Sequence, residues 1–155
     1  MIARKMFFAM AMFACGGMSL AGEVNEKTIG EFFRNIEGKW ELKTDAKEEF
    51  REYEIQKEGN LLMLGETIIG GFSAILSDLY TFKNGKLFRG TKGKIETLVL
   101  ESTPTVLEYA QPSGETISLM RCEVNGDALK LRIILLKDNK ITEVSTNILK
   151  KLKQM

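Results

Sequence analysis

From residue 39 to residue 149, apolar and polar residues alternate with a period of two, and turn signals interrupt this alternation about every ten to twelve residues. A period of two places the apolar side chains on one face of an extended strand. Glycine, asparagine, aspartate and proline at the interruptions are typical of tight turns between strands. The pattern predicts ten strands, at 39–44, 48–57, 61–68, 74–83, 86–91, 94–101, 106–111, 116–124, 128–137 and 141–149.

Links this short join strands that are neighbours in space, so we expect an antiparallel meander. A flat sheet of this many strands would leave two long edges and one apolar face exposed to water. Curling the sheet until it closes removes both problems. The sequence therefore predicts an all-β fold, an antiparallel up-and-down β-barrel of eight to ten strands.

One segment ahead of the strands has a helical period instead. Thr28 and Glu31 have the Ser/Thr-x-x-Glu spacing of a capping box, and Gly38 follows as a stop signal. Between these signals, apolar residues recur three or four positions apart, at Ile29, Phe32, Phe33 and Ile36. This stripe predicts one short amphipathic helix that covers one end of the barrel.

The segment 1–21 has the organisation of a secretory signal peptide. Arg4 and Lys5 precede an uncharged apolar run at 6–14, and small residues lead up to Ala21, where a signal peptidase would cleave. The apolar run is too short to span a membrane. We therefore expect an exported protein, periplasmic or secreted.

The mature chain expected after cleavage is a single domain at 22–155, with no transmembrane span. An alternative is a lipoprotein signal in which Cys15 becomes the lipidated first residue. Cys122 then remains as the only other cysteine of the chain, and we expect it to be a small buried apolar residue.

Composition excludes several classes of site. The chain has no histidine and only two cysteines, which rules out Ser-His-Asp and Cys-His nucleophiles and histidine-ligated zinc or haem. Its 22 lysines and arginines balance 21 aspartates and glutamates, so no charge excess favours a nucleic acid as partner. We expect no metal site, no cofactor and no enzymatic activity.

The motif Gly38-Lys39-Trp40 opens the first predicted strand, directly after the predicted helix. In this position, with an all-β meander following, it resembles the calycin barrels, which include lipocalins, fatty-acid-binding proteins and bacterial lipocalin-like domains. The resemblance implies that the Trp40 indole packs across the closed end of the barrel. Only Lys150 and Lys151 lie near the place of the basic residue that stacks on this tryptophan in the family.

Other family motifs are absent. The sequence lacks the lipocalin Thr-Asp-x-Asn-Tyr motif and the Arg-x-Tyr carboxylate clamp that fatty-acid-binding proteins carry in their final strands. The resemblance thus implies the fold rather than a particular ligand.

A barrel interior is the place where a small ligand would bind. Several predicted strands carry a charge or a phenol among apolar neighbours, and the candidate ligand-binding residues are Arg121, Tyr109, Tyr80, Tyr53 and Asp78. An inward Arg121 would need a carboxylate partner from Asp78, Glu143 or a ligand. The alternative is that Arg121 faces water, with Met120, Cys122 and Val124 on the inner row.

These observations favour an exported barrel that binds a small apolar or amphipathic molecule in its lumen. An envelope interaction protein, or a protease-inhibitor-like barrel that uses its outer face or loops, is the alternative. Ile134 and Leu136 fall on the outer row of their strand and would belong to such a surface. Four glutamates of the second predicted strand are expected to form one solvated face, at Glu48, Glu49, Glu52 and Glu54.

Overall fold

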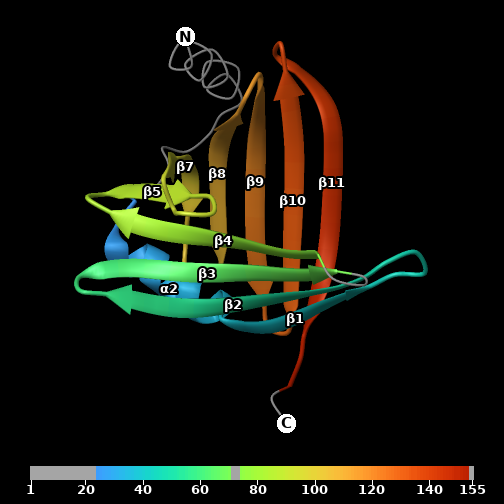
Figure 1. Ribbon diagram of the computed structural model, residues 1–155, viewed down its shortest axis with the longest axis horizontal. Coiled ribbons are helices and arrows are strands. Elements are labelled where there is room, and N and C mark those ends of the chain that lie inside the picture. Colours follow the sequence, from blue (N-terminus) through green and yellow to red (C-terminus); the bar gives the residue numbers. More distant parts are fainter. Residues whose placement is uncertain (1–23, 71–73, 154–155) are drawn as a thin grey trace.

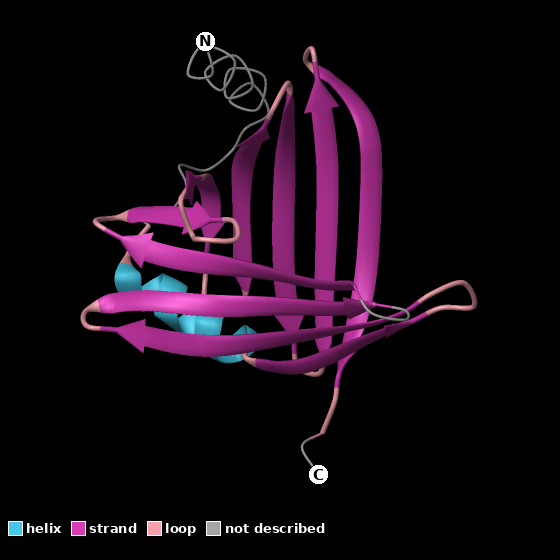
Figure 2. Cartoon of the chain, in the orientation of Figure 1, coloured by secondary structure: helices cyan, strands magenta, loops and turns pink. Residues whose placement is uncertain are grey.

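The computed structural model describes residues 24–70 and 74–153 (Figures 1 and 2). The predicted signal peptide at 1–21 and the alternative lipidation site Cys15 lie outside the described residues. A helix, α2 (Glu26–Ile36), precedes the strands. The strands are β1 (Gly38–Lys43), β2 (Glu48–Glu58), β3 (Leu61–Gly70), β4 (Ala74–Lys83), β5 (Lys86–Arg89), β6 (Ile95–Glu96), β7 (Leu98–Ser102), β8 (Val106–Ser113), β9 (Thr116–Asn125), β10 (Ala128–Lys137) and β11 (Lys140–Lys151).

The eleven described strands form a single antiparallel sheet in the order β6-β5-β4-β3-β2-β1-β11-β10-β9-β8-β7. Strands that follow one another in the chain pair along most of the sheet, and β1 also pairs with β11. The two edge strands, β6 and β7, are separated only by Thr97, so the sheet must curl until its edges approach. The predicted antiparallel up-and-down architecture is confirmed.

The strand count is one higher than the predicted range, because the strand predicted at 94–101 is two strands. At the break, the backbone N–H and the Oγ1 of Thr97 both donate to the Leu87 carbonyl oxygen, at 2.9 Å each. These bonds hold the crossing between β6 and β7 against β5. A hydroxyl that competes for a backbone carbonyl is a recognised cause of such interruptions.

The two halves of the sheet cross each other. Figure 1 shows β2, β3 and β4 running across the direction of β8–β11, and β8–β11 extending past β4 in this view. The helix α2 contacts β2 and β3 from one half and β7 and β8 from the other. It therefore covers one end of the interior, as the sequence predicts.

The helix begins three residues earlier than a cap at Thr28 implies. Asn25 is the N-cap, and its Oδ1 accepts from the Thr28 backbone N–H at 2.9 Å and from the Thr28 hydroxyl at 3.1 Å. Asparagine is at least as good an N-cap as threonine, which explains the earlier start. The predicted apolar stripe is buried in full, with Phe33 and Ile29 at 0% exposure.

Trp40 lies at the helix-covered end of the interior. Its side chain is fully buried, and its Nε1 donates to the Ile36 carbonyl oxygen at 2.8 Å. Lys151, its partner in register on β11, places its Nζ 5.1 Å from the indole centroid. Of the two lysines that the sequence leaves open, Lys151 is therefore the one that stacks on the tryptophan.

Gly38 opens β1 with a φ of +129°, a conformation that L side chains rarely adopt. A Cβ at this position would also lie 3.1 Å from the Lys151 Cε. The glycine therefore provides the turn from helix to strand and the space for the lysine that stacks on Trp40.

A candidate ligand-binding interior

The most buried carboxylate of the described interior belongs to Glu66, in the middle of β3. Its side chain is 1% exposed. Oε1 accepts from the Tyr53 hydroxyl at 2.8 Å and from Arg51 Nη1 at 3.1 Å. Oε2 accepts from Arg89 Nη2 at 3.2 Å and from the Tyr80 hydroxyl at 3.3 Å. Four donors on both oxygens make this buried charge tolerable.

Strand register explains why these side chains meet. Glu66 on β3 lies opposite Tyr53 on β2 and Asp78 on β4, and residues in direct register point to the same face. Tyr80 follows Asp78 by two positions and so shares its face. Arg89, from β5, reaches the same place, and its Nη2 lies 3.1 Å from Asp78 Oδ2.

Tyr109 joins this group from β8, in the opposite half of the sheet. Its hydroxyl lies 3.1 Å from that of Tyr80, and the two rings are edge to face with centroids 6.1 Å apart. Because the Tyr80 hydroxyl donates to Glu66, its oxygen is left to accept from Tyr109. The two halves of the barrel are thus joined by a polar contact in the interior.

Glu49 extends the group along β2. Its Oε1 lies 2.6 Å from Arg51 Nε, and its Oε2 pairs with Lys47. Burial by itself would raise the pKa of Glu49, but the hydrogen bonds from Lys47 and Arg51 hold it below its ordinary value. The residues of this interior cluster are Glu49, Arg51, Tyr53, Glu66, Asp78, Tyr80, Arg89 and Tyr109.

The expectation of one solvated glutamate face on this strand is wrong for Glu49, which is 4% exposed. Glu49 precedes Arg51 by two residues and Tyr53 by four, so its side chain points to the same inner face as theirs. Glu48, Glu52 and Glu54 are exposed. Two cations beside Glu49 offset the cost of burying it.

Burial sets the protonation of the interior cluster. It raises the pKa of Tyr53, Tyr80 and Tyr109 well above the ordinary value, so these phenols are neutral donors at neutral pH. Burial alone would lower the pKa of the Arg89 guanidinium, but the surrounding tyrosines and the carboxylates of Glu66 and Asp78 raise it. The arginines of the interior cluster therefore stay charged.

Arg121 does not lie with the other four predicted residues. It is on the outer face of β9, where its Nη1 pairs with Glu101 and Glu108, each at 2.5 Å. These partners replace the expected inward ones, Asp78 and Glu143. The orientation left open as the alternative is the one observed, with Met120, Cys122 and Val124 on the inner row.

Cys122 is a buried free cysteine in the described part of the chain, as expected of a small core residue. Burial raises the pKa of its thiol to about 12, and the nearby charge of Glu66 adds to this rise. The thiolate is the nucleophilic form of cysteine, so this side chain is inert at neutral pH.

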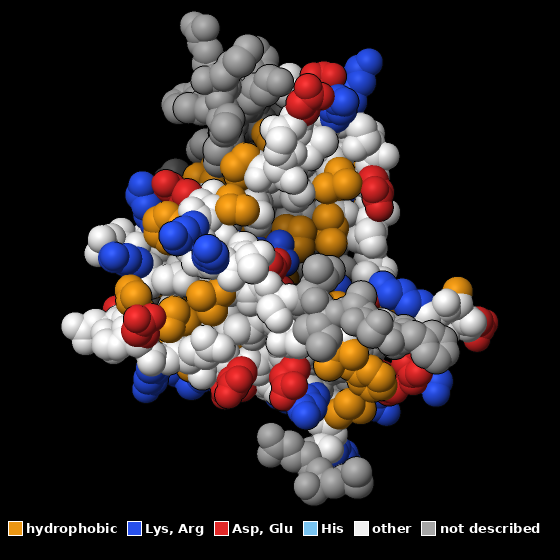
Figure 3. Space-filling model, in the orientation of Figure 1, with side chains coloured by type: hydrophobic (Ala, Val, Ile, Leu, Met, Phe, Trp, Pro, Cys, Tyr) orange, Lys and Arg blue, Asp and Glu red, His pale blue; other side chains and the backbone are white. Residues whose placement is uncertain are grey.

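The inner face of β9 and β10 becomes less buried with distance from the helix-covered end. Leu129 and Leu131 are 0% and 4% exposed, whereas Ile133 and Leu135 on the same face are only half-buried. Met120 lies opposite Ile133 and Tyr109 in register and is also half-buried. Figure 3 shows hydrophobic side chains over β9 and β10 in a recess above β4, with charged side chains at its lower edge.

Four residues of the interior cluster are not among the predicted ligand-binding residues: Glu49, Arg51, Glu66 and Arg89. Glu66 is the only charge in the apolar strand β3, and that isolation was the available signal. Arg89 lies at the end of β5, only four residues long, which gives too little alternation to assign a face. Arg51 shares a row with Tyr53 in the sequence but was not predicted as a site residue.

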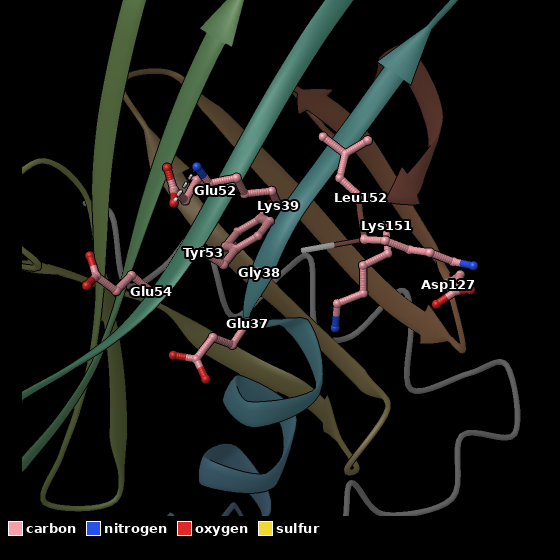
Figure 4. Close-up of a pocket in the computed structure, with 10 residues that line it drawn as sticks. Glu37, Gly38, Lys39, Glu52, Tyr53, Glu54, Asp127, Lys151 and Leu152 are labelled. Carbon is pink, nitrogen blue, oxygen red and sulfur yellow. Dashed lines mark ion pairs between the residues drawn. The ribbon is translucent and has the colours of Figure 1, made fainter. Parts of the chain in front are cut away.

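A second hollow lies outside the barrel, where β1 begins and the chain leaves β11. It has a volume of about 600 Å³. Figure 4 shows Lys39, Glu52, Asp127 and Lys151 around it, with Lys39 paired to Glu52 at 3.5 Å. Its charges are mixed and mostly solvated, so it has no preference for an anion or a cation.

Among the described residues, no group of histidine, cysteine, aspartate and glutamate side chains has the arrangement of a metal site. The described part of the chain also contains no helix with the length and hydropathy needed to cross a bilayer.

No protein-family model and no curated protein matches the sequence. Solved structures do match the fold. A Schistosoma mansoni fatty acid binding protein in complex with arachidonic acid aligns with a TM-score of 0.52 and 15% identity, covering 79% of this chain and 99% of that one. A mutant of the fluorescent protein UnaG aligns with a TM-score of 0.50 and 14% identity, covering 78% of this chain and 99% of that one. The fold is therefore of the calycin type.

Proposed function

We propose that the protein binds a small apolar or amphipathic molecule in the interior of its barrel. The observation that carries the proposal is the half-buried apolar inner face of Met120, Ile133 and Leu135. In a filled core such side chains are almost fully buried, as Leu129 and Leu131 are on β10. The half-buried residues keep apolar surface that a ligand would cover.

The likeness to a fatty acid binding protein in complex with arachidonic acid supports a barrel of suitable shape. In the same proposal, the chain is a bacterial lipocalin-like protein, exported by the segment 1–21 and acting as a carrier without enzymatic activity. The Gly38-Lys39-Trp40 motif supports the lipocalin-like assignment, because Trp40 and Lys151 stack as the resemblance implies.

Native mass spectrometry of the protein purified from its own host tests this function. We expect an added mass that denaturation releases and that organic extraction identifies as a small apolar or amphipathic compound. An Ile133→Trp variant, which fills the inner face, should lose this mass. Ile134→Trp, one residue along the same strand but on the outer face, should retain it. A wild-type protein without any added mass, or equal retention in both variants, would overturn the proposal.

A second candidate function is binding of another envelope protein, and the outer face of β10 and β11 favours it. Ile134 lies opposite Val144, and Leu136 lies opposite Ile141. Val144 and Ile141 are 53% and 64% exposed, which is unusual for side chains of this kind.

Substitution of Val144 by lysine would separate the two functions. If the outer face binds a protein, the variant should lose a partner that cross-linking recovers from the envelope fraction, and should keep any ligand in the interior. Recovery of the same partner by wild type and variant would exclude this face.

A further inference from the structure

Together with Lys47, which pairs with Glu49, the charges of the interior cluster neutralise one another without a ligand. Arg51 pairs with Glu49 and Glu66, and Arg89 pairs with Glu66 and Asp78. Lys47 is the third cation, paired with Glu49. Three cations therefore face three carboxylates, and the positive charge that a buried acid would need is already taken.

Glu66 occupies the position between the two arginines that a ligand carboxylate would otherwise claim. Its oxygens already accept from both guanidinium groups and from the hydroxyls of Tyr53 and Tyr80. A second carboxylate here would approach Glu66 at short range, in surroundings that screen charge poorly. It would also meet donors that are already in use.

Three buried side-chain polar atoms have no hydrogen-bond partner among the described residues: Arg89 Nε, Ser102 Oγ and Gln111 Oε1. Arg89 Nε is a buried donor and Gln111 Oε1 is a buried acceptor. Gln111 lies two residues beyond Tyr109 on β8, and therefore on the same face. An ionised carboxylate can accept a hydrogen bond but has no hydrogen to donate, whereas a hydroxyl group can do both.

Resting on the proposed function, we infer that the interior selects uncharged amphipathic molecules with a hydroxyl at the polar end, and rejects the corresponding fatty acids. The apolar part would lie along Met120, Ile133 and Leu135, and the hydroxyl would lie toward Tyr109 and Arg89. In this proposal Glu66 determines selectivity, because its negative charge repels a second carboxylate.

Competition between two probes of equal chain length tests this inference. The full-length protein, freed of bound material, is loaded with Nile red, which is uncharged, and then titrated with dodecanol or dodecanoate at a pH where the acid is ionised. We expect dodecanol to displace the dye with an affinity at least about tenfold higher than dodecanoate.

Glu66→Gln keeps the size and acceptor oxygen of the side chain and removes its charge. In this variant the preference should move toward dodecanoate by about tenfold or more, because two arginines then lack a full counter-charge. Glu54→Gln, on the exposed face of β2, is the matched control and should keep the wild-type preference.

A second measurement covers the case in which Glu66→Gln does not fold. Dodecanoate binding by the wild-type protein should strengthen as the pH is lowered and the acid loses its charge, whereas dodecanol binding should change little. Equal or tighter binding of ionised dodecanoate would overturn the selectivity and leave the carrier function standing. If neither Nile red nor either probe binds, the carrier function itself fails, and the selectivity falls with it.

Discussion

The two halves of the barrel face the interior with different chemistry. The half that contains β2–β5 places charged and phenolic side chains inward, and each is fixed by ion pairs and hydrogen bonds. The half that contains β8–β10 places mainly apolar side chains inward, fully buried at one end and half-buried at the other. The polar half is therefore held by its own contacts, whereas the end of the apolar half that lies away from the helix is where we propose that a ligand binds.

The largest expected effect is in the polar half. Glu66→Ala would remove a shared counter-charge from Arg51 and Arg89, and removal of one member of a buried ion pair destabilises by about 3–5 kcal/mol. We expect a loss near the lower end, about 3 kcal/mol, because Glu49 and Asp78 remain as partners. The free energy of unfolding from urea denaturation measures it. A loss as small as that of Glu54→Ala, an exposed residue, would show that the interior cluster is not a structural unit.

The next effect distinguishes the two ends of the apolar half. Leu129→Ala, at the fully buried end of β10, should lower the free energy of unfolding by about 3 kcal/mol. Ile133→Ala, at the half-buried end of the same strand, should lower it by about 1 kcal/mol, because less apolar surface is lost. Urea denaturation of both variants measures the difference. Equal losses would mean that Ile133 lies in a filled core, contrary to the proposed binding site.

Two hydroxyl deletions compare the strengths of two hydrogen bonds within the interior cluster. Tyr53→Phe removes a hydrogen bond to the charged Glu66 and should destabilise by about 2 kcal/mol. Tyr109→Phe removes a bond between two neutral hydroxyls and should destabilise by about 1 kcal/mol. Thermal denaturation of both variants against the wild type provides the test. The reverse order would contradict the assignment of Glu66 as the charged centre.

The sequence was sufficient for the fold because the fold depends on signals within single strands. Alternation and turn residues gave the strands and their up-and-down order, and the period of the helix gave its buried face. The break at Thr97 was not predictable in this way, since it depends on a carbonyl oxygen of β5, ten residues earlier in the chain.

The interior cluster was only partly predictable for the same reason. Tyr53, Tyr80 and Asp78 share rows with apolar residues, and that was enough to place them inward. Arg121 was ambiguous because both rows of β9 contain apolar residues, and only its pairing with Glu108 across the strands places it outside. The role of Glu66 depends on donors from three other strands, and no pattern within β3 contains them.

The smallest expected effect concerns Glu49, which pairs with the exposed Lys47 and with Arg51. Lys47 and Arg51 hold its pKa below the ordinary value of 4.5 in the folded protein. The unfolded chain therefore binds a proton at Glu49 before the folded one does as the pH falls. The stability that Glu49 contributes is complete above about pH 4.5 and is lost as the pH drops through the lowered pKa.

Glu49→Gln should accordingly be less stable than the wild type at neutral pH, and the difference should shrink in acid. Urea midpoints measured over a series of pH values test this expectation. The deficit of Leu129→Ala, a side chain without a titrating group, should stay nearly constant over the same series. A Glu49→Gln deficit that also stays constant would mean that the carboxylate gains nothing from its cations. Ion pairing would then not be what stabilises the polar half, and the two halves would not differ in their electrostatics.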